Sequence, residues 1–250
     1  MNKTIIVQGR VTEWTQKNIH NLRNLTDARI IFSTWKDQPI KELARDGVEI
    51  LLLDDPGPGP VQNFNRQIFG LQKAMDICED GLILKTRSDM VHNIDPFSLW
   101  QKDKIQDSKF KLFEHKVFIS NIMSIDSYKI IPGEGYRFFS PSDWILLGEK
   151  RDIGAWVDVN GTSKLISNLL TDYHYCCEQL WCLSNIIKLP SIFKMIDVEN
   201  LKKSETNQHI SACFIENNFK VLNTISTFKA TCGRYSHQPE DLSFYIQEKK

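Results

Sequence analysis

The sequence lacks the glycine-rich loops with which many nucleotide-binding proteins hold phosphates. It contains neither GxxxxGK followed by Ser or Thr, nor a GxGxxG after its first predicted strand, which excludes the P-loop and dinucleotide-binding fingerprints. None of its six cysteines forms a CxxC pair, so we interpret them as reduced thiols and expect no zinc site. An apolar run of about 18 residues, long enough to span a membrane, is also missing.

Neither sign of charge predominates, because 31 Lys and Arg residues balance 31 Asp and Glu residues. Such a chain has no overall field that attracts nucleic acid or an anionic membrane. We therefore expect no nucleic-acid partner and at most peripheral contact with a membrane. The apolar run near the N-terminus is too short for a signal peptide, so we expect a cytoplasmic protein. Its 250 residues suffice for one domain, with halves at 1–95 and 96–250.

The first ninety residues alternate between strand and helix patterns. Apolar runs predict strands at 4–7, 29–35, 48–53 and 82–84, and helical spacing predicts helices at 15–25, 41–44 and 65–78. Thr15 is the expected N-cap of the first helix. This order is typical of an α/β fold with a mostly parallel sheet flanked by helices.

After residue 95 the regular alternation of strand and helix patterns ends, which predicts a smaller region of mixed structure. Strand candidates lie at 117–124, 137–139, 144–147, 219–222 and 224–228, and helices are expected at 152–156, 165–170 and 175–183. From about residue 194 the pattern is the least informative, mixing short strand candidates with polar linkers.

Charged residues gather where the predicted strand 82–84 ends, namely Lys85, Arg87 and Asp89. Ligands bind beyond the carboxyl ends of parallel strands, so these cations and Arg66, near a helix start, could converge on a diphosphate. Asp89 could hold a divalent cation that bridges phosphate oxygens. The alternatives are a solvated strand exit, an exposed helix cation and an aspartate that caps a turn. The Pro- and Gly-rich loop at 54–60 is either a plain connection or ligand-facing.

The segments IIVQGR, RIIFSTW, DDPG, NRQIFGLQKAMDICEDGLILKTRSD, PSDW and CEQLW occur in an order that resembles the WavE-type lipopolysaccharide synthesis family. The likeness covers most of the first 185 residues. More loosely, the central stretch is similar to that of GT-A glycosyltransferases. The resemblance implies a GT-A-like fold and transfer of a sugar from a nucleotide-sugar donor to a bacterial surface glycan, lipopolysaccharide or capsule, on an acceptor that could be lipid-linked.

The resemblance also implies a set of donor-binding residues. Gln8 and Gly9 match the first strand-end loop, which lies against base and ribose in such folds, and Asp54 or Asp55 matches an acid that contacts the nucleotide. The implied donor set is Gln8, Gly9, Asp55, Asn65, Arg66, Lys85 and Arg87. Where the family's metal motif usually has carboxylates, this chain has Lys85 and Arg87, and Asp89 is the remaining acid. Either Mg²⁺ or Mn²⁺ bound at Asp89, or the cations themselves, would then neutralise the diphosphate.

Two carboxylates are candidates for the catalytic step. Glu178 resembles the acid that opens the acceptor-side helix in GT-A enzymes, and we assign it as the base that takes the proton from the acceptor hydroxyl. Asp143 is assigned to the acceptor, beside Trp144, whose ring could stack on a sugar. On this assignment Glu178→Gln abolishes transfer and preserves donor binding. A surface glutamate and an Asx-turn aspartate are the structural alternatives.

Two other functions remain open. A nucleotidyltransferase would also need a cationic diphosphate site, but its usual glycine-rich signature is missing after the first strand. A non-catalytic scaffold of polysaccharide assembly with a degenerate transferase fold would explain the missing acidic pair in KTRSD. His115 and His237 could be metal ligands, but lone histidines are more often structural or solvated.

Overall fold

The structure is a computed structural model that describes residues 1–43, 47–121, 130–131, 135–136, 138–159, 161–170, 175–201, 203–224 and 226–232. Its strands are β1 (Asn2–Gln8), β2 (Arg29–Trp35), β3 (Glu49–Leu53), β4 (Gly81–Arg87), β5 (Met90–His92), β6 (Val117–Ser120), β7 (Ile130–Ile131), β8 (Gly135–Tyr136), β9 (Ile145–Glu149), β10 (Phe219–Leu222) and β11 (Ala230–Cys232). Its α-helices are α1 (Glu13–Leu25), α2 (Phe64–Asp76), α3 (Lys150–Val157), α4 (Thr162–Leu169), α5 (Cys177–Ile186), α6 (Pro190–Phe193) and α7 (Glu205–Asn218). Two 3₁₀ helices cover Pro96–Leu99 and Ser108–Phe110.

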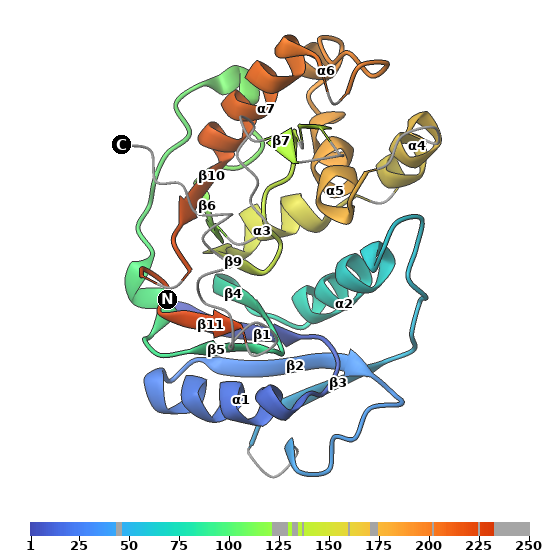
Figure 1. Ribbon diagram of the computed structural model, residues 1–250. Helices are drawn as coiled ribbons and strands as arrows, with labels where there is room; N and C mark the ends of the chain where they lie inside the picture. Colours follow the sequence, from blue (N-terminus) through green and yellow to red (C-terminus); the bar gives the residue numbers. More distant parts are fainter. Residues whose placement is uncertain are drawn as a thin grey trace.

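Seven strands form the central sheet, in the order β10-β6-β9-β4-β1-β2-β3 (Figure 1). β1 pairs in parallel with β2 and β4, β2 pairs in parallel with β3, and β10 pairs in parallel with β6. Strand β9 is antiparallel to both β4 and β6, so it runs against the other strands of this sheet. The carboxyl ends of β1, β2, β3 and β4 therefore meet at one edge, where open α/β sheets bind ligands.

The alternation of side chains along each strand separates two apolar clusters, one on each face of the sheet. Ile5 and Val7 of β1 share a cluster with Leu22 of α1, whereas Ile6 shares the other cluster with Leu71 of α2. Figure 1 shows α1 and α2 on opposite sides of the sheet. Burying one such apolar side chain contributes about 1.5–3 kcal/mol, so the apolar residues determine which side of each strand faces which cluster. Because successive side chains point to opposite faces, this also determines the face on which each polar strand residue lies.

The predicted α/β architecture with a mostly parallel central sheet is confirmed. β2 matches the expected range 29–35, and the structure places strands or helices in the predicted regions of β1, β3, β4, β6, β9 and β10 and of α1 to α5. Within the described part of the chain, no helix is both long and apolar enough to cross a membrane.

Several local predictions were wrong. Helix α1 begins at Glu13 with Thr12 as its N-cap, and Thr15 instead accepts a hydrogen bond from the Thr12 backbone N–H at 2.8 Å. Of the predicted helix 41–44, residues 41 and 42 form a turn, residue 43 is in 3₁₀ conformation, and 44 lies outside the described residues. The described parts of 137–139 and 224–228 are irregular or turns, although a short strand, β11, follows at Ala230–Cys232. Residues 122–124 of the predicted strand 117–124 and Arg137 also lie outside the described residues.

Candidate functional site

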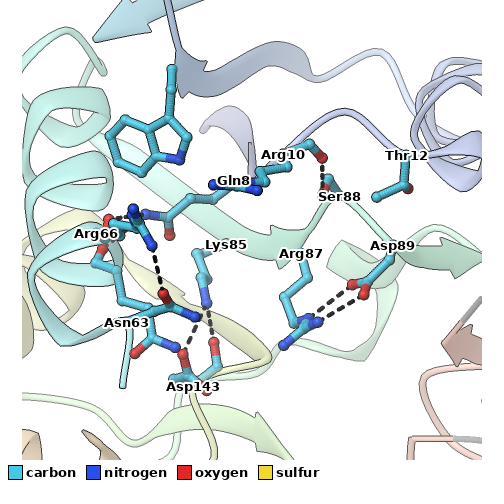
Figure 2. Close-up of a pocket in the computed structure, with 13 residues that line it drawn as sticks. Gln8, Arg10, Thr12, Asn63, Arg66, Lys85, Arg87, Ser88, Asp89 and Asp143 are labelled. Carbon is cyan, nitrogen blue, oxygen red and sulfur yellow. Dashed lines mark hydrogen bonds and ion pairs between the residues drawn. The ribbon is translucent and has the colours of Figure 1, made fainter. Parts of the chain in front are cut away.

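A pocket of about 390 Å³ opens at the carboxyl ends of β1 and β4, beside the start of α2 (Figure 2). Its lining residues are Gln8, Gly9, Arg10, Thr12, Trp35, Asn63, Arg66, Gln67, Lys85, Arg87, Ser88, Asp89 and Asp143. In β4, Ile83 lies in the apolar cluster below α2, so the alternation of side chains also points Lys85 and Arg87 to that face. On this face of the sheet, apolar residues thus pack under α2, and polar residues lie where the strands end at their carboxyl termini.

Gly9 permits the close approach of the two strand ends that form the pocket floor. Its φ of +139° lies in a region that favours glycine, and a Cβ here would lie 2.6 Å from Ser88 Oγ. The Ser88 backbone N–H donates to the Gln8 carbonyl at 3.0 Å, and Ser88 Oγ donates to the Arg10 carbonyl at 2.7 Å. Residues 8–10 and 88 are therefore held together by one backbone hydrogen bond and one from the Ser88 side chain.

The amide of Gln8 connects β1 to α2. Its Nε2 donates to the carbonyls of Arg66 at 3.1 Å and Gln67 at 2.8 Å, which fixes the orientation of the amide. Gly70 leaves room for this contact, since a Cβ on Gly70 would lie 2.5 Å from Gln8 Nε2. The buried Oε1 of Gln8 has no hydrogen-bond partner. Gln8 therefore sets the position of the first turn of α2, which carries Arg66.

Arg66 forms an ion pair with Asp55 from the Pro- and Gly-rich loop. Its Nε donates to Asp55 Oδ1 at 2.8 Å and its Nη2 to Asp55 Oδ2 at 2.6 Å, while Nη1 donates to Asn63 Oδ1 at 3.0 Å. The hydrogen bonds from Arg66 lower the pKa of Asp55. This arrangement orders the loop after β3 against α2, and the half-buried guanidinium remains at the pocket wall.

Arg87 is held on two sides. It donates from Nε to Asp89 Oδ1 at 2.8 Å and from Nη2 to Asp89 Oδ2 at 2.7 Å, and its guanidinium lies 4.2 Å from the centre of the Trp144 ring. Burial alone would lower the pKa of Arg87, but the bonds and attraction to Asp89 outweigh it and raise the pKa. Trp144 is buried and one face of its ring is covered by Arg87, which argues against the predicted stacking of that face on a sugar.

Lys85 and Asp143 form a buried pair at the bottom of the pocket. Their side chains are 2% and 3% exposed, and Lys85 Nζ lies 3.6 Å from Asp143 Oδ2. Lys85 Nζ also donates to the Asp143 main-chain carbonyl (Figure 2). Burial lowers the pKa of Lys85, and the neighbouring Asp143 carboxylate only partly offsets this effect.

Glu178 lies in the first turn of α5 and is not among the residues that line the pocket. It is 6% exposed, and Cys177 Sγ donates to its Oε2 at 3.2 Å. Burial raises the pKa of Glu178, and the charge of Asp143 raises it further. The two predicted catalytic carboxylates are thus close enough to influence each other, but Asp143 is the one at the pocket.

Of the ten predicted site residues, the structure brings seven to this pocket. These are Gln8, Gly9, Arg66, Lys85, Arg87, Asp89 and Asp143. The other three do not line it. Asp55 contacts the pocket through Arg66, and Asn65 donates its backbone N–H to the Pro58 carbonyl in the loop. Glu178 is buried outside the pocket lining.

Six lining residues were not predicted, namely Arg10, Thr12, Trp35, Asn63, Gln67 and Ser88. Arg10 and Ser88 directly follow the predicted strand-end residues, so the same strand-end argument would have found them. Trp35 is buried and ends β2, at the edge of the sheet where the pocket opens.

The carboxylates of this pocket do not fit a divalent cation in the arrangement described. Magnesium or manganese would need one or two carboxylates to be available, but Asp89 accepts two bonds from Arg87 and Asp143 pairs with Lys85. Asp89 therefore has Arg87 as its partner instead of the predicted metal.

A group with possible metal ligands, His115, Glu149 and Asp152, lies at the other edge of the sheet. Glu149 pairs in register with Leu82, at the start of β4, whereas Arg87 ends that strand. Arg151 and Lys102 form ion pairs with Glu149, and two backbone N–H groups donate to Asp152. His115 thus has neighbours that account for its position, and His237 lies outside the described residues.

Comparison with known proteins gives similar solved structures but no matching curated protein. The glycosyltransferase GlyE of Streptococcus pneumoniae TIGR4 is 14% identical with a TM-score of 0.41, over 91% of this chain and 46% of GlyE. TarS of S. aureus is 13% identical with a TM-score of 0.37, over 89% of this chain and 35% of TarS. An active-site mutant of LgtC is 14% identical with a TM-score of 0.44, over 72% of this chain and 68% of LgtC. The chain spans less than half the length of GlyE and of TarS.

The sequence itself matches a known family over most of its length. The match covers residues 4–227 and so includes every residue that lines the pocket. The chain belongs to the WavE lipopolysaccharide synthesis family.

Proposed function

We propose that this protein is a glycosyltransferase with a GT-A-like fold, which transfers a sugar from a nucleotide-sugar donor onto a bacterial surface glycan. The observation that carries the proposal is the pocket at the carboxyl edge of the parallel strands, which is lined by Arg10, Arg66, Lys85 and Arg87 in a chain of this family. A cationic pocket at this edge suits the diphosphate of a nucleotide sugar. The acceptor class, lipopolysaccharide or capsule, follows from the family alone.

The diphosphate would lie against the arginines at the pocket wall. Arg66 and Arg87 are about one quarter exposed, and Arg10 is exposed and forms no ion pair within the described residues. Arg66 and Arg87 already have carboxylate partners, so a bound diphosphate would share or replace these. Solvent screens a pair as exposed as Asp55–Arg66, so its replacement costs little.

The residues of the second half of the chain contribute the acceptor side. Asp143 reaches the pocket from the segment before β9, opposite the donor-binding residues of 1–95. This placement supports the division of one domain into a donor half and an acceptor half. A cytoplasmic location and peripheral contact with a lipid-linked acceptor belong to the same proposal.

Two alternatives would leave different signatures. A scaffold with a degenerate transferase fold would bind no nucleotide, whereas a nucleotidyltransferase would release pyrophosphate from a nucleoside triphosphate and a sugar phosphate. The glycosyltransferase releases a nucleoside diphosphate from a nucleotide sugar.

The proposal is tested by measuring the melting temperature with UDP, GDP, CDP, ADP and dTDP, each in EDTA and in Mn²⁺. We expect at least one nucleotide to raise the melting temperature, because a ligand of the folded state stabilises it by mass action. Arg66→Ala should weaken that binding about 10-fold, since hydrogen bonds to charged groups contribute about 1.5–3 kcal/mol.

Arg29→Ala is the matched control, because Arg29 forms a similar pair with Glu49, at 2.9 and 2.5 Å, away from the pocket. It should leave nucleotide binding unchanged. If none of the five nucleotides stabilises the protein under either condition, the scaffold becomes the better explanation.

A further inference from the structure

The predicted donor site does not explain the buried ion pair between Lys85 and Asp143 at the bottom of the pocket. Lys85 was predicted as a phosphate ligand, but its side chain is 2% exposed, compared with 25% for Arg66 and 24% for Arg87. Its ammonium group is directed at Asp143 through the main-chain carbonyl and the carboxylate (Figure 2). Because both of these contacts hold its ammonium group against Asp143, Lys85 is poorly placed to bind a diphosphate as well.

Asp143 is the group that Lys85 holds. Its Oδ2 is the oxygen nearest Lys85 Nζ, at 3.6 Å, whereas its Oδ1 is buried and has no hydrogen-bond partner. A buried acceptor without a donor costs about 1–3 kcal/mol. Asp143 lines the pocket, so a hydroxyl that reaches this covered oxygen from the pocket would supply the missing donor.

We propose that Lys85 is a positioning residue, which holds Asp143 through its Oδ2 and its main-chain carbonyl and leaves Oδ1 to accept from the incoming acceptor hydroxyl. The inference rests on the proposed glycosyltransferase function and assigns the base to Asp143 instead of Glu178.

In the step that follows, the acceptor oxygen forms a bond to the anomeric carbon of the donor, and its proton moves to Asp143 Oδ1. The bond between that carbon and the diphosphate oxygen breaks, and its electron pair leaves with the nucleoside diphosphate. The charge that develops on the leaving group lies near Arg66 and Arg87. Lys85 contacts neither reactant in this scheme and acts through Asp143.

The buried location explains why the base needs a cation beside it. An isolated buried carboxylate favours its neutral form, which cannot accept a proton from a hydroxyl. Removing one partner of a buried pair also costs more than removing both, because the remaining charge is left uncompensated. Lys85 and Asp143 should therefore behave as one unit in both stability and catalysis.

The test is a double-mutant cycle of Lys85→Met, Asp143→Asn and the double variant. The assay follows nucleoside diphosphate released from a panel of UDP-, GDP-, CDP-, ADP- and dTDP-linked sugars. We expect each single variant to lower kcat by about 100-fold or more, the size of a general-base contribution. The double variant should be no slower than Asp143→Asn, because both changes remove the same function.

Two further readouts separate positioning from phosphate binding and from misfolding. Lys85→Met should leave the affinity for the nucleoside diphosphate within about threefold of the wild type, since the arginines hold the phosphates in this scheme. The double variant should recover the melting temperature lost in Lys85→Met but not its kcat, because it removes the uncompensated charge.

Independent effects that multiply in the double variant, or a loss of nucleotide affinity that accounts for the loss of rate, would overturn the inference and make Lys85 a phosphate ligand. A wild-type protein that binds no nucleotide and hydrolyses no sugar donor would instead refute the proposed function.

Discussion

Glu178 is a buried acid at the start of α5, and its surroundings favour the protonated form. It is 6% exposed, and Cys177 Sγ donates to one of its oxygens. Burial and the charge of Asp143 both raise its pKa above the ordinary value of 4.5. Glu178 can support the start of the helix, but it does not line the pocket and so is not placed to take a proton from an acceptor there.

Glu178→Gln separates the two assignments of the catalytic base. If Glu178 were the base, the variant would lose transfer, as the family resemblance implies. We expect it to keep kcat within about 10-fold, because a general base contributes more than that and glutamine has the shape of a neutral glutamic acid. Initial rates with a nucleotide sugar decide this, and a loss of about 1000-fold would restore Glu178 as the base.

The same variant has a stability signature. A carboxyl whose folded pKa is raised binds more protons when folded than when unfolded, so its contribution falls as the pH rises above 4.5. Glu178→Gln lacks this titration. Urea unfolding should therefore show that the variant gains stability relative to the wild type as the pH rises above 4.5, and a constant difference would contradict the raised pKa.

His92 is a second buried titratable group, away from the pocket. It is fully buried in β5, its Nε2 lies 2.9 Å from Thr86 Oγ1, and its Nδ1 has no hydrogen-bond partner. Burial lowers the pKa of His92 from 6.5 to about 4. The folded protein therefore holds a neutral imidazole over most of the physiological range.

The expected consequence is a loss of stability in mild acid. A lowered folded pKa means that the unfolded chain binds more protons, so stability falls as the pH drops below 6.5 toward 4, by about 3 kcal/mol at most. His92→Gln should flatten this part of the unfolding profile. His20→Gln, at an exposed position in α1, is the control and should leave the slope unchanged; equal slopes in all three proteins would refute the prediction.

At the scale of elements, helix α2 places Arg66 by packing closely on β1 and β2. Ser33 Oγ donates to the Gly70 carbonyl at 2.9 Å, and Gln8 Nε2 lies where a Cβ on Gly70 would project. The approach of the helix to the strands therefore depends on the missing side chain of one residue.

Gly70→Ala should destabilise the protein, although glycine is normally the poorer helix residue. The new Cβ would lie 2.5 Å from Gln8 Nε2 and would displace the amide from its two carbonyl partners. We expect a loss of about 1–3 kcal/mol, as for overpacked cores, together with weaker nucleotide binding. Gly154→Ala in α3 is the matched control, because its Cβ would meet only Met75 Cε at 4.0 Å, and it should gain about 0.5–1 kcal/mol. Urea unfolding of the two variants measures both effects.

The elements that could be predicted are those whose buried faces are apolar. β1, β2 and α1 carry apolar residues at the correct period, and so the sequence indicates them directly. Helix α7 was missed because three of its five buried positions are polar, namely Asn207, Ser211 and Asn218. Asn218 donates to the carbonyls of Phe110 and Phe214, and Ser211 Oγ accepts from the Phe139 backbone N–H. Phe110 and Phe139 lie far from α7 along the chain, so sequence periodicity carries no signal of these contacts.

The candidate site, like the fold, has features that the sequence predicts and features that it does not. Gln8, Lys85 and Arg87 could be predicted, because the end of a parallel strand implies a common edge. The burial of Lys85 against Asp143 could not be predicted, because Asp143 lies 58 residues further along the chain and is brought close by the pairing of β9 with β4. Arg66, Lys85 and Arg87 line one pocket, but the carboxylate partner of each cation depends on tertiary packing.

At the scale of the whole molecule, the antiparallel strand β9 separates two sets of charged groups. The segment before β9 carries Asp143 to the pocket, and Glu149 at its far end joins His115 and Asp152 at the opposite edge. Arg87 is five residues beyond the partner of Glu149 in β4, a separation of roughly 16 Å along the strand. A cation bound to His115, Glu149 and Asp152 could therefore not touch a diphosphate in the pocket.

Any effect of Mn²⁺ on nucleotide binding should consequently be independent of the cluster of His115, Glu149 and Asp152. We expect Asp152→Asn and Glu149→Gln to leave the affinity for a nucleoside diphosphate unchanged, within about twofold, both in EDTA and in Mn²⁺, because the charges are separated by more than a Debye length of about 8–10 Å. Asp89→Asn is the informative comparison, since Asp89 is the partner of Arg87 at the pocket. If isothermal titration shows that Asp152→Asn removes a response to Mn²⁺ and Asp89→Asn does not, the two edges communicate and the donor site extends beyond the pocket described above.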